Sequence, residues 1–146
     1  MTTLRTILLA EDSPADAEMA IDALQEARLA NPIVHVEDGV EVMDYLLRRG
    51  AWAGREEGLA AVLLLDIKMP RMDGLEVLRQ IREHEELKRL PVVILSSSRE
   101  ESDLARSWDM GVNAYVVKPV DVDQFFGAVQ TLGKFWALIN QAPELE

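Results

Sequence analysis

The stretch Val62-Leu63-Leu64-Leu65-Asp66-Ile67-Lys68-Met69-Pro70 (VLLLDIKMP) decides the fold of this chain. A run of aliphatic residues without alternation is typical of a strand buried on both faces of a sheet, and here it leads directly into the carboxylate of Asp66. Burying a polar group without a partner costs about 2 kcal/mol or more, and a lone charge costs more still. We therefore expect other parts of the chain to supply partners for Asp66.

Apolar runs of the same kind recur along the chain and alternate with segments of helical spacing. The runs lie at residues 6–10, 33–36, 61–65, 92–95 and 114–117. Leu104 and Trp108 mark the fourth helical segment, and the fifth is marked by Phe125, Val129, Leu132, Trp136 and Ile139. Alternating strands and helices with right-handed crossovers predict a parallel sheet covered by helices on both faces. For five strands we expect the flavodoxin-like (βα)5 doubly wound α/β fold with strand order 2-1-3-4-5.

Length and charge limit the classes of protein to consider. The chain has 146 residues, no cysteine, and 26 acidic against 15 basic residues, a formal net charge of −11. We expect a single domain over residues 1–146, with a core at about 6–132, a fifth helix to about 140 and a frayed tail at 141–146. The negative charge argues against direct nucleic-acid binding. The apolar runs are too short for a signal sequence or a membrane span, so we expect a cytoplasmic protein.

The predicted strand order brings carboxylates together at one edge of the sheet. Its ligand crevice lies at the carboxyl ends of the first and third strands, where the sequence has Glu11, Asp12 and Asp66. Like charges at short range oppose ionisation unless a cation lies between them, and Mg2+ prefers a few carboxylate oxygens and keeps several waters. We expect Mg2+ with Asp12 and Asp66 as direct ligands, Glu11 acting through a water, and the backbone carbonyl of Lys68 as a further ligand.

The ends of the last two strands add groups that suit phosphate chemistry. Ser96 follows the fourth strand and Lys118 the fifth, so a hydroxyl and a positive charge lie along the same edge. Phosphoryl transfer needs mainly positioning and charge stabilisation, and a carboxylate can accept the group as an aspartyl phosphate. The residues therefore predict a phosphoryl acceptor at Asp66.

These motifs resemble those of a CheY-like receiver domain of a two-component response regulator. The similarity spans residues 6–132 and rests on Glu11-Asp12, on Asp66 followed by Met69-Pro70 and Asp73-Gly74, on Ser96 after PVVIL, and on Lys118-Pro119 after AYVV. It implies that Asp66 is the phosphoacceptor, that Glu11 and Asp12 hold Mg2+, and that Lys118 contacts the phosphoryl group. It also implies a cis Lys118–Pro119 bond, and a switch pair formed by Ser96 and Tyr115.

The resemblance has consequences for partners as well. It implies a sensor histidine kinase as phosphoryl donor, slow self-catalysed hydrolysis, and output through protein contacts. A narrower resemblance is to single-domain regulators paired with bacterial phytochrome kinases, which are commonly homodimers. It is carried by the long loop after the second helix with Trp52, by LLDIKMPRMDGLEVL, by KPVDVDQF and by GKFWALIN. Phe126, Phe135 and Leu138 fall outside the inward stripe of the fifth helical segment. We expect a dimer or partner surface there, spanning the fourth helix, the fifth strand and the fifth helix, unless the tail covers these residues.

Other functions remain to be weighed against the switch. A small-molecule Mg2+ phosphohydrolase with an aspartyl nucleophile usually has a second Asp two residues later, where this chain has Lys68. A receiver that binds partners without being phosphorylated is a further alternative. Nucleotide or flavin binding is disfavoured, because Glu11 and Asp12 stand where a glycine-rich phosphate loop would follow the first strand.

Overall fold

The computed structural model describes residues 5–26, 31–55, 60–106, 110–112, 114–124 and 127. Its elements are β1 (Ile7–Ala10), α1 (Pro14–Glu26), β2 (Ile33–Val36), α2 (Gly39–Leu47), the short 3-10 helix η1 (Gly50–Trp52), β3 (Val62–Asp66), α3 (Gly74–Glu83), β4 (Val92–Ser96), α4 (Arg99–Arg106) and β5 (Ala114–Val117). Residues 122–124 and 127 are helical. The rest of the predicted fifth helix, with Phe126, Phe135 and Leu138, and the tail at 141–146 lie outside the described residues.

The five strands form one parallel sheet in the order β2-β1-β3-β4-β5, as predicted. Ile7 of β1 lies opposite Ile33 of β2 on one side and Val62 of β3 on the other. At the other end of the strands, Asp66 lies opposite Leu95. This register aligns the carboxyl ends of the strands along one edge, which is where the predicted site residues follow.

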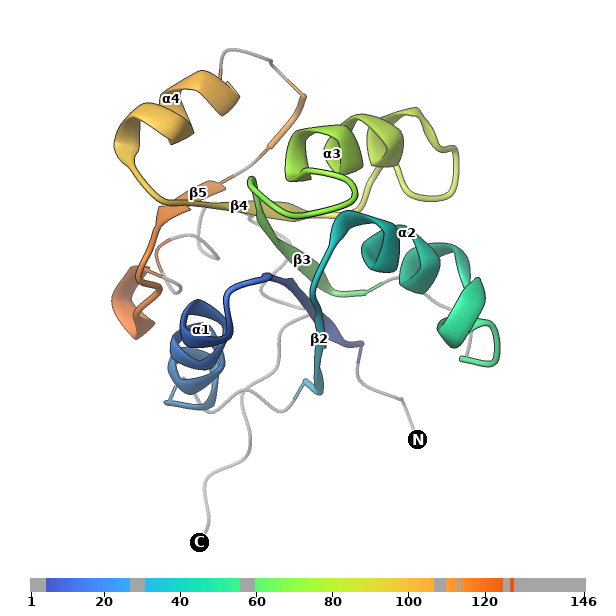
Figure 1. Ribbon diagram of the computed structural model, residues 1–146, viewed down its shortest axis with the longest axis horizontal. Coiled ribbons are helices and arrows are strands. Elements are labelled where there is room, and N and C mark those ends of the chain that lie inside the picture. Colours follow the sequence, from blue (N-terminus) through green and yellow to red (C-terminus); the bar gives the residue numbers. More distant parts are fainter. Residues whose placement is uncertain are drawn as a thin grey trace, which may run out of the picture.

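Helices cover both faces of the sheet, so its central strands are buried on both sides. Every residue of β1, β3 and β4 is buried. Leu9 and Leu64 pack on the side of α1, and their neighbours Leu8 and Leu63 pack on the side of α2 and α3. In Figure 1, α1 lies on one side of the sheet, and α2, α3 and α4 lie on the other. This two-sided burial explains why the strand sequences are continuous apolar runs.

Side-chain caps fix the start of the helices that follow the sheet edge. Asp38 accepts a hydrogen bond from the backbone N–H of Glu41 (2.8 Å), and Asp73 accepts one from Glu76 (2.9 Å). Such caps satisfy donors that the first helical turn leaves free. Among the described residues, no helix combines the length and the apolar character that crossing a membrane requires.

Small residues of α4 face the core, and its one large apolar residue does not. Leu104 is 61% exposed, and the buried residues of α4 are Ser102 and Ala105. Positions 102 and 105 share one face of the helix, whereas position 104 is turned about 200° away from 102, since each residue advances by about 100°. Leu104 therefore lies in the fourth helix, as predicted, but on the face turned away from the sheet, and Trp108 lies outside the described residues.

The segment between α2 and β3 packs on α2. The ring of Trp52 meets that of Tyr45 edge to face, with 4.9 Å between centroids, and the guanidinium of Arg55 lies 4.3 Å from the centroid of the Tyr45 ring. The Tyr45 hydroxyl reaches Thr6 beside β1 at 2.7 Å. These contacts anchor the start of this segment, which the sequence indicates only as a long loop.

Candidate functional site

Backbone hydrogen bonds continue the sheet ladder past the strands and fix the residues at its carboxyl edge. The N–H of Glu11 donates to Val36 (3.0 Å), and the N–H of Lys118 donates to Ser96 (2.7 Å). The Lys118–Pro119 bond that follows is cis, as the resemblance implies. The side chains of Glu11 and Lys118 are therefore presented from a rigid backbone on the two sides of Asp66.

The edge gathers the three predicted carboxylates. Glu11, Asp12 and Asp66 each offer an oxygen, and these oxygens lie within 4.8 Å of one another. Glu11 is 1% and Asp66 3% exposed, while Asp12 is exposed. Hard carboxylate oxygens at this spacing, with one side open to solvent for water ligands, fit a divalent cation such as Mg2+.

The ammonium group of Lys118 is shared among three carboxylates. Its Nζ lies 2.9 Å from Glu11 Oε1, 3.0 Å from Asp16 Oδ2 and 3.3 Å from Asp66 Oδ1. Asp12 lies beside Glu11 and Asp66, so the site combines four carboxylates with this ammonium group. The site therefore keeps an excess of negative charge, which a divalent cation would offset.

Burial and charge change the pKa of the central groups. The pKa of Asp66 is raised to about 7. Burial is the largest cause, the charge of Glu11 and its hydrogen bond also raise the pKa, and Lys118 opposes the rise. For Lys118, burial alone would lower the pKa, but hydrogen bonds to Glu11 and Asp16 and the charge of Asp66 outweigh burial and raise it. Lys118 thus stays charged, and Asp66 changes its protonation near neutral pH.

Close packing of α3 against β3 fixes the backbone of Asp66. The N–H of Gly74 donates to the carbonyl of Ile67 (2.7 Å). A Cβ at Gly74 would overlap the backbone oxygen of Asp66 and come within 2.9 Å of Ile67 Cα. Glycine at position 74 therefore allows the start of α3 to lie directly on the residue that carries the predicted chemistry.

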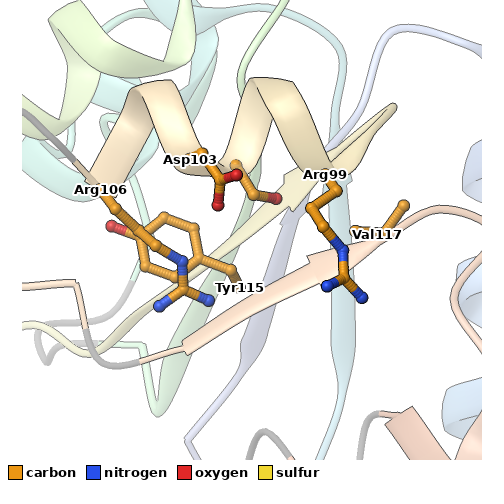
Figure 2. A pocket seen from close by; sticks show the side chains of 6 residues that line it. Arg99, Asp103, Arg106, Tyr115 and Val117 are labelled. Atoms are coloured by element: carbon orange, nitrogen blue, oxygen red, sulfur yellow. The ribbon is translucent and has the colours of Figure 1, made fainter.

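The two predicted switch residues contact α4. The buried hydroxyl of Ser96 shares a hydrogen bond with the hydroxyl of Ser102. The guanidinium of Arg106 lies over the ring of Tyr115, 4.0 Å from its centroid. Figure 2 shows Arg106 beside the ring of Tyr115. A pocket of about 360 Å³ lies there between α4 and β5, and it is lined by Arg99, Ser102, Asp103, Arg106, Tyr115 and Val117.

Lys68 is also connected to α4 through its side chain. Its exposed ammonium group lies 3.4 Å from Glu101, whose carboxylate accepts hydrogen bonds from the N–H and the hydroxyl of Ser97, both at 3.0 Å. Burial opposes ionisation of Glu101, but these hydrogen bonds and the ion pair with Lys68 hold its pKa below the ordinary value. The loop after β3 and the start of α4 are thereby linked across the rim of the site.

Sequence reasoning did not predict the contacts of Asp16, Glu101, Ser102 and Arg106. Asp16 carries the clearest signal in retrospect, because it lies in the first turn of a helix that starts just after Glu11-Asp12. A first-turn carboxylate of that helix can face back over the sheet edge. His35 of β2 places Nε2 2.8 Å from the backbone oxygen of Glu11.

Comparison with known proteins points to one family. The model of the response regulator receiver domain matches residues 7–130. The response regulator Rcp1 of Synechocystis sp. is 33% identical over 132 residues, which cover 90% of this chain and 88% of Rcp1. A relative of nearly equal length thus aligns with almost the whole chain.

Solved structures give the same picture in three dimensions. The bacteriophytochrome response regulator AtBRR is 52% identical, with a TM-score of 0.90 over 96% of this chain and all of that one. The phosphorylated cyanobacterial phytochrome response regulator RcpA is 37% identical, with a TM-score of 0.72 over 92% of this chain and 94% of that one. The Mn2+-bound form of Rcp1 is 32% identical, with a TM-score of 0.72 over 96% and 99% of the two chains.

Proposed function

The chain belongs to the response regulator receiver domain family, and from that premise we propose that it accepts a phosphoryl group on Asp66 from the phosphohistidine of a sensor histidine kinase. The observation that supports this proposal most directly is the environment of the Asp66 side chain. Its carboxylate is buried beside Glu11 and Asp12 and lies 3.3 Å from the ammonium group of Lys118. That arrangement supplies a nucleophile, a place for a cation and a fixed positive charge.

In the proposed transfer, an ionised oxygen of Asp66 attacks the phosphorus, and the bond from phosphorus to the histidine nitrogen breaks. The electron pair of that bond stays on the ring nitrogen of the donor. Lys118 stays protonated and faces the phosphoryl oxygens, where charge must be stabilised. Hydrolysis reverses the modification: water attacks the phosphorus, inorganic phosphate leaves, and the Asp66 carboxylate is restored. We accordingly propose a switch protein and not an enzyme acting on a separate substrate.

The donor set fits a divalent metal, and we propose Mg2+. Glu11, Asp12 and Asp66 would hold it, joined by the backbone carbonyl of Lys68. When bound, the metal would supply positive charge that keeps Asp66 ionised and that shields the incoming phosphoryl oxygens. The Mn2+-bound form of Rcp1 supports a divalent ion in a relative of this chain.

For the output we propose that phosphorylation changes the positions of Ser96 and Tyr115. Both residues contact α4, Ser96 through Ser102 and Tyr115 through Arg106. A phosphoryl group that draws the Ser96 hydroxyl toward Asp66 would break its bond to Ser102 and bias α4 between two states. We propose that α4, β5 and the fifth helix, with Phe126, Phe135 and Leu138, form the homodimer or partner surface that reads this change.

We also propose that the donor is a phytochrome-type kinase. AtBRR is described as a bacteriophytochrome response regulator and RcpA as a cyanobacterial phytochrome response regulator, and each matches more than nine-tenths of this chain. Transfer assays from a phosphorylated bacteriophytochrome kinase and from an unrelated sensor kinase would test this. A clear preference for the unrelated kinase would contradict the proposal.

The test of the proposed function is intact mass after incubation with acetyl phosphate, with and without Mg2+. Wild type should gain one phosphoryl group only with Mg2+, and Asp66→Asn should gain none. Asp22→Asn is the matched control, since it removes the same charge from an exposed position on α1. Absence of an adduct together with absence of fluoroberyllate binding would overturn the phosphoacceptor role. Size-exclusion chromatography of the same samples measures any change of assembly.

A further inference from the structure

Asp16 occupies a place in the site that the family motifs did not predict. Its Oδ2 accepts a hydrogen bond from the ammonium group of Lys118 at 3.0 Å, nearly as close as Glu11 at 2.9 Å and closer than Asp66 at 3.3 Å. The side chain of Lys118 is only 14% exposed, and that of Asp16 is 36% exposed. The ion pair is therefore partly shielded from solvent.

The local backbone holds Asp16 in this position. The N–H of Asp16 donates to the hydroxyl of Ser13 at 3.3 Å, and the N–H of Ser13 donates to Glu11 Oε2 at 3.2 Å. The turn between β1 and α1 thus connects Asp16 to the same carboxylate with which it shares Lys118. The backbone of Asp16 is thereby tied to the sheet edge, and the side chain of Asp16 is held by its ion pair with Lys118.

Asp16 differs from the other three carboxylates because it is not part of the group that could hold a metal ion. Glu11, Asp12 and Asp66 form the group that could hold a metal ion, and Asp16 stands outside it. A metal bound by those three would offset their charge and leave Asp16 as the anion beside Lys118. An ammonium group has three N–H donors. Each donor that Asp16 holds is one that phosphoryl oxygens on Asp66 do not receive.

We propose that Asp16 is a competing counter-ion for Lys118, which holds the lysine in the unphosphorylated state and so lowers the affinity of the site for phosphoryl oxygens. This inference rests on the proposed function and deepens it. Asp16 touches no reacting atom in this arrangement and acts through Lys118, so it is a positioning residue. Lys118 keeps its bond to Glu11 when Asp16 is removed, and it therefore stays at the site.

The test measures two affinities by titration of intrinsic tryptophan fluorescence: that for Mg2+ alone, and that for fluoroberyllate at saturating Mg2+. Asp16→Asn should bind fluoroberyllate about threefold to fivefold more tightly than wild type, the upper part of the range expected for a partly exposed ion pair. Its Mg2+ affinity should be unchanged or slightly weaker, because the substitution removes a negative charge near the cation. A role in folding alone would weaken both affinities together.

Two further variants make the comparison specific. Asp16→Glu keeps the charge and should bind fluoroberyllate within about twofold of wild type, since the charged partner of Lys118 is retained. Asp22→Asn removes one charge from the exposed side of α1 and should also match wild type. Circular dichroism melts check that each variant is folded.

The outcomes separate this inference from the function on which it rests. If wild type binds fluoroberyllate but Asp16→Asn binds it equally well or more weakly, the counter-ion role is overturned and the proposed function stands. If wild type binds none at saturating Mg2+ and also fails to gain mass with acetyl phosphate, the proposed function falls, and this inference falls with it.

Discussion

The chemistry at the scale of single residues depends on the protonation of Asp66. Burial raises its pKa to about 7, so in the metal-free protein about half of the molecules carry a protonated Asp66 near neutral pH. We expect the carboxyl carbon of Asp66, followed by NMR in labelled protein, to titrate close to pH 7. Lys118→Met should raise the pKa further, because the ammonium group of Lys118 lowers it. A measured pKa of Asp66 below 5 in the metal-free wild type would contradict the expected rise.

The same shift makes stability depend on pH. The native pKa of about 7 exceeds the ordinary value of 3.8, so between these values the folded protein binds more protons at Asp66 than the unfolded chain does. The free energy of unfolding therefore falls as pH rises from about 4 to about 7, and the share due to Asp66 is up to about 4 kcal/mol. In urea unfolding of the metal-free protein, the stability of Asp66→Asn should rise relative to that of wild type as pH rises over this range. Parallel pH profiles for the two proteins would refute the shift.

At this scale, part of the site was predictable from the sequence and part was not. Glu11 and Asp12 follow β1, Asp66 ends β3, and Lys118 follows β5. The strand order alone brings these positions together. Asp16 lies on a helix, where a rotation of one residue would have turned its side chain away. The difference lies in the geometry: a parallel sheet fixes where its strands end, whereas the face of a short helix is fixed only by packing.

At the scale of elements, the contact between α3 and β3 supports the site. Gly74→Ala should destabilise the fold by about 2 kcal/mol, because the added methyl group overlaps the Asp66 backbone and the two elements must separate. Alanine favours a helix over glycine by up to about 1 kcal/mol, which would act in the opposite direction. Urea unfolding measures the balance, and fluoroberyllate affinity should fall as the backbone of Asp66 is displaced.

Gly54→Ala is the matched control for that change. Among the described residues, no atom lies within 4 Å of a Cβ placed at Gly54. This variant should unfold at the same urea concentration as wild type and should bind fluoroberyllate equally well. Equal stability of Gly74→Ala and Gly54→Ala would show that the close approach of α3 to β3 does not constrain the site.

The strands were easier to predict than the helices, for a physical reason. Two-sided burial leaves continuous apolar runs, and these runs begin and end within one residue of β1, β3 and β4. Helix α4 has eight residues, most of them polar, and it faces the sheet with Ser102 and Ala105. Small residues allow a helix to lie close to the sheet, but they leave no apolar stripe in the sequence. Leu104 marks the helix in the sequence, but it does not show which face of the helix lies on the sheet.

At the scale of the whole molecule, the excess of negative charge and the acidic site both destabilise the folded state through repulsion. The chain carries a formal net charge of −11, and two of its carboxylates, Glu11 and Asp66, are buried together at the sheet edge. Repulsion within this pair is present in the folded state and relieved in the unfolded chain. A ligand that binds only the folded state stabilises it by mass action. Metal binding at this edge should therefore stabilise the entire domain.

We expect Mg2+ to raise the melting temperature, and to raise it more at pH 8 than at pH 6. At a concentration about 100 times its Kd, a ligand specific to the folded state contributes about 2.7 kcal/mol. The pH dependence follows because Asp66, with a pKa of about 7, must lose its proton to bind the metal. Differential scanning calorimetry with NaCl at equal ionic strength separates this effect from screening of the net charge. An equal rise with NaCl, or in Asp66→Asn, would mean that Mg2+ acts on the surface and not at the acidic site.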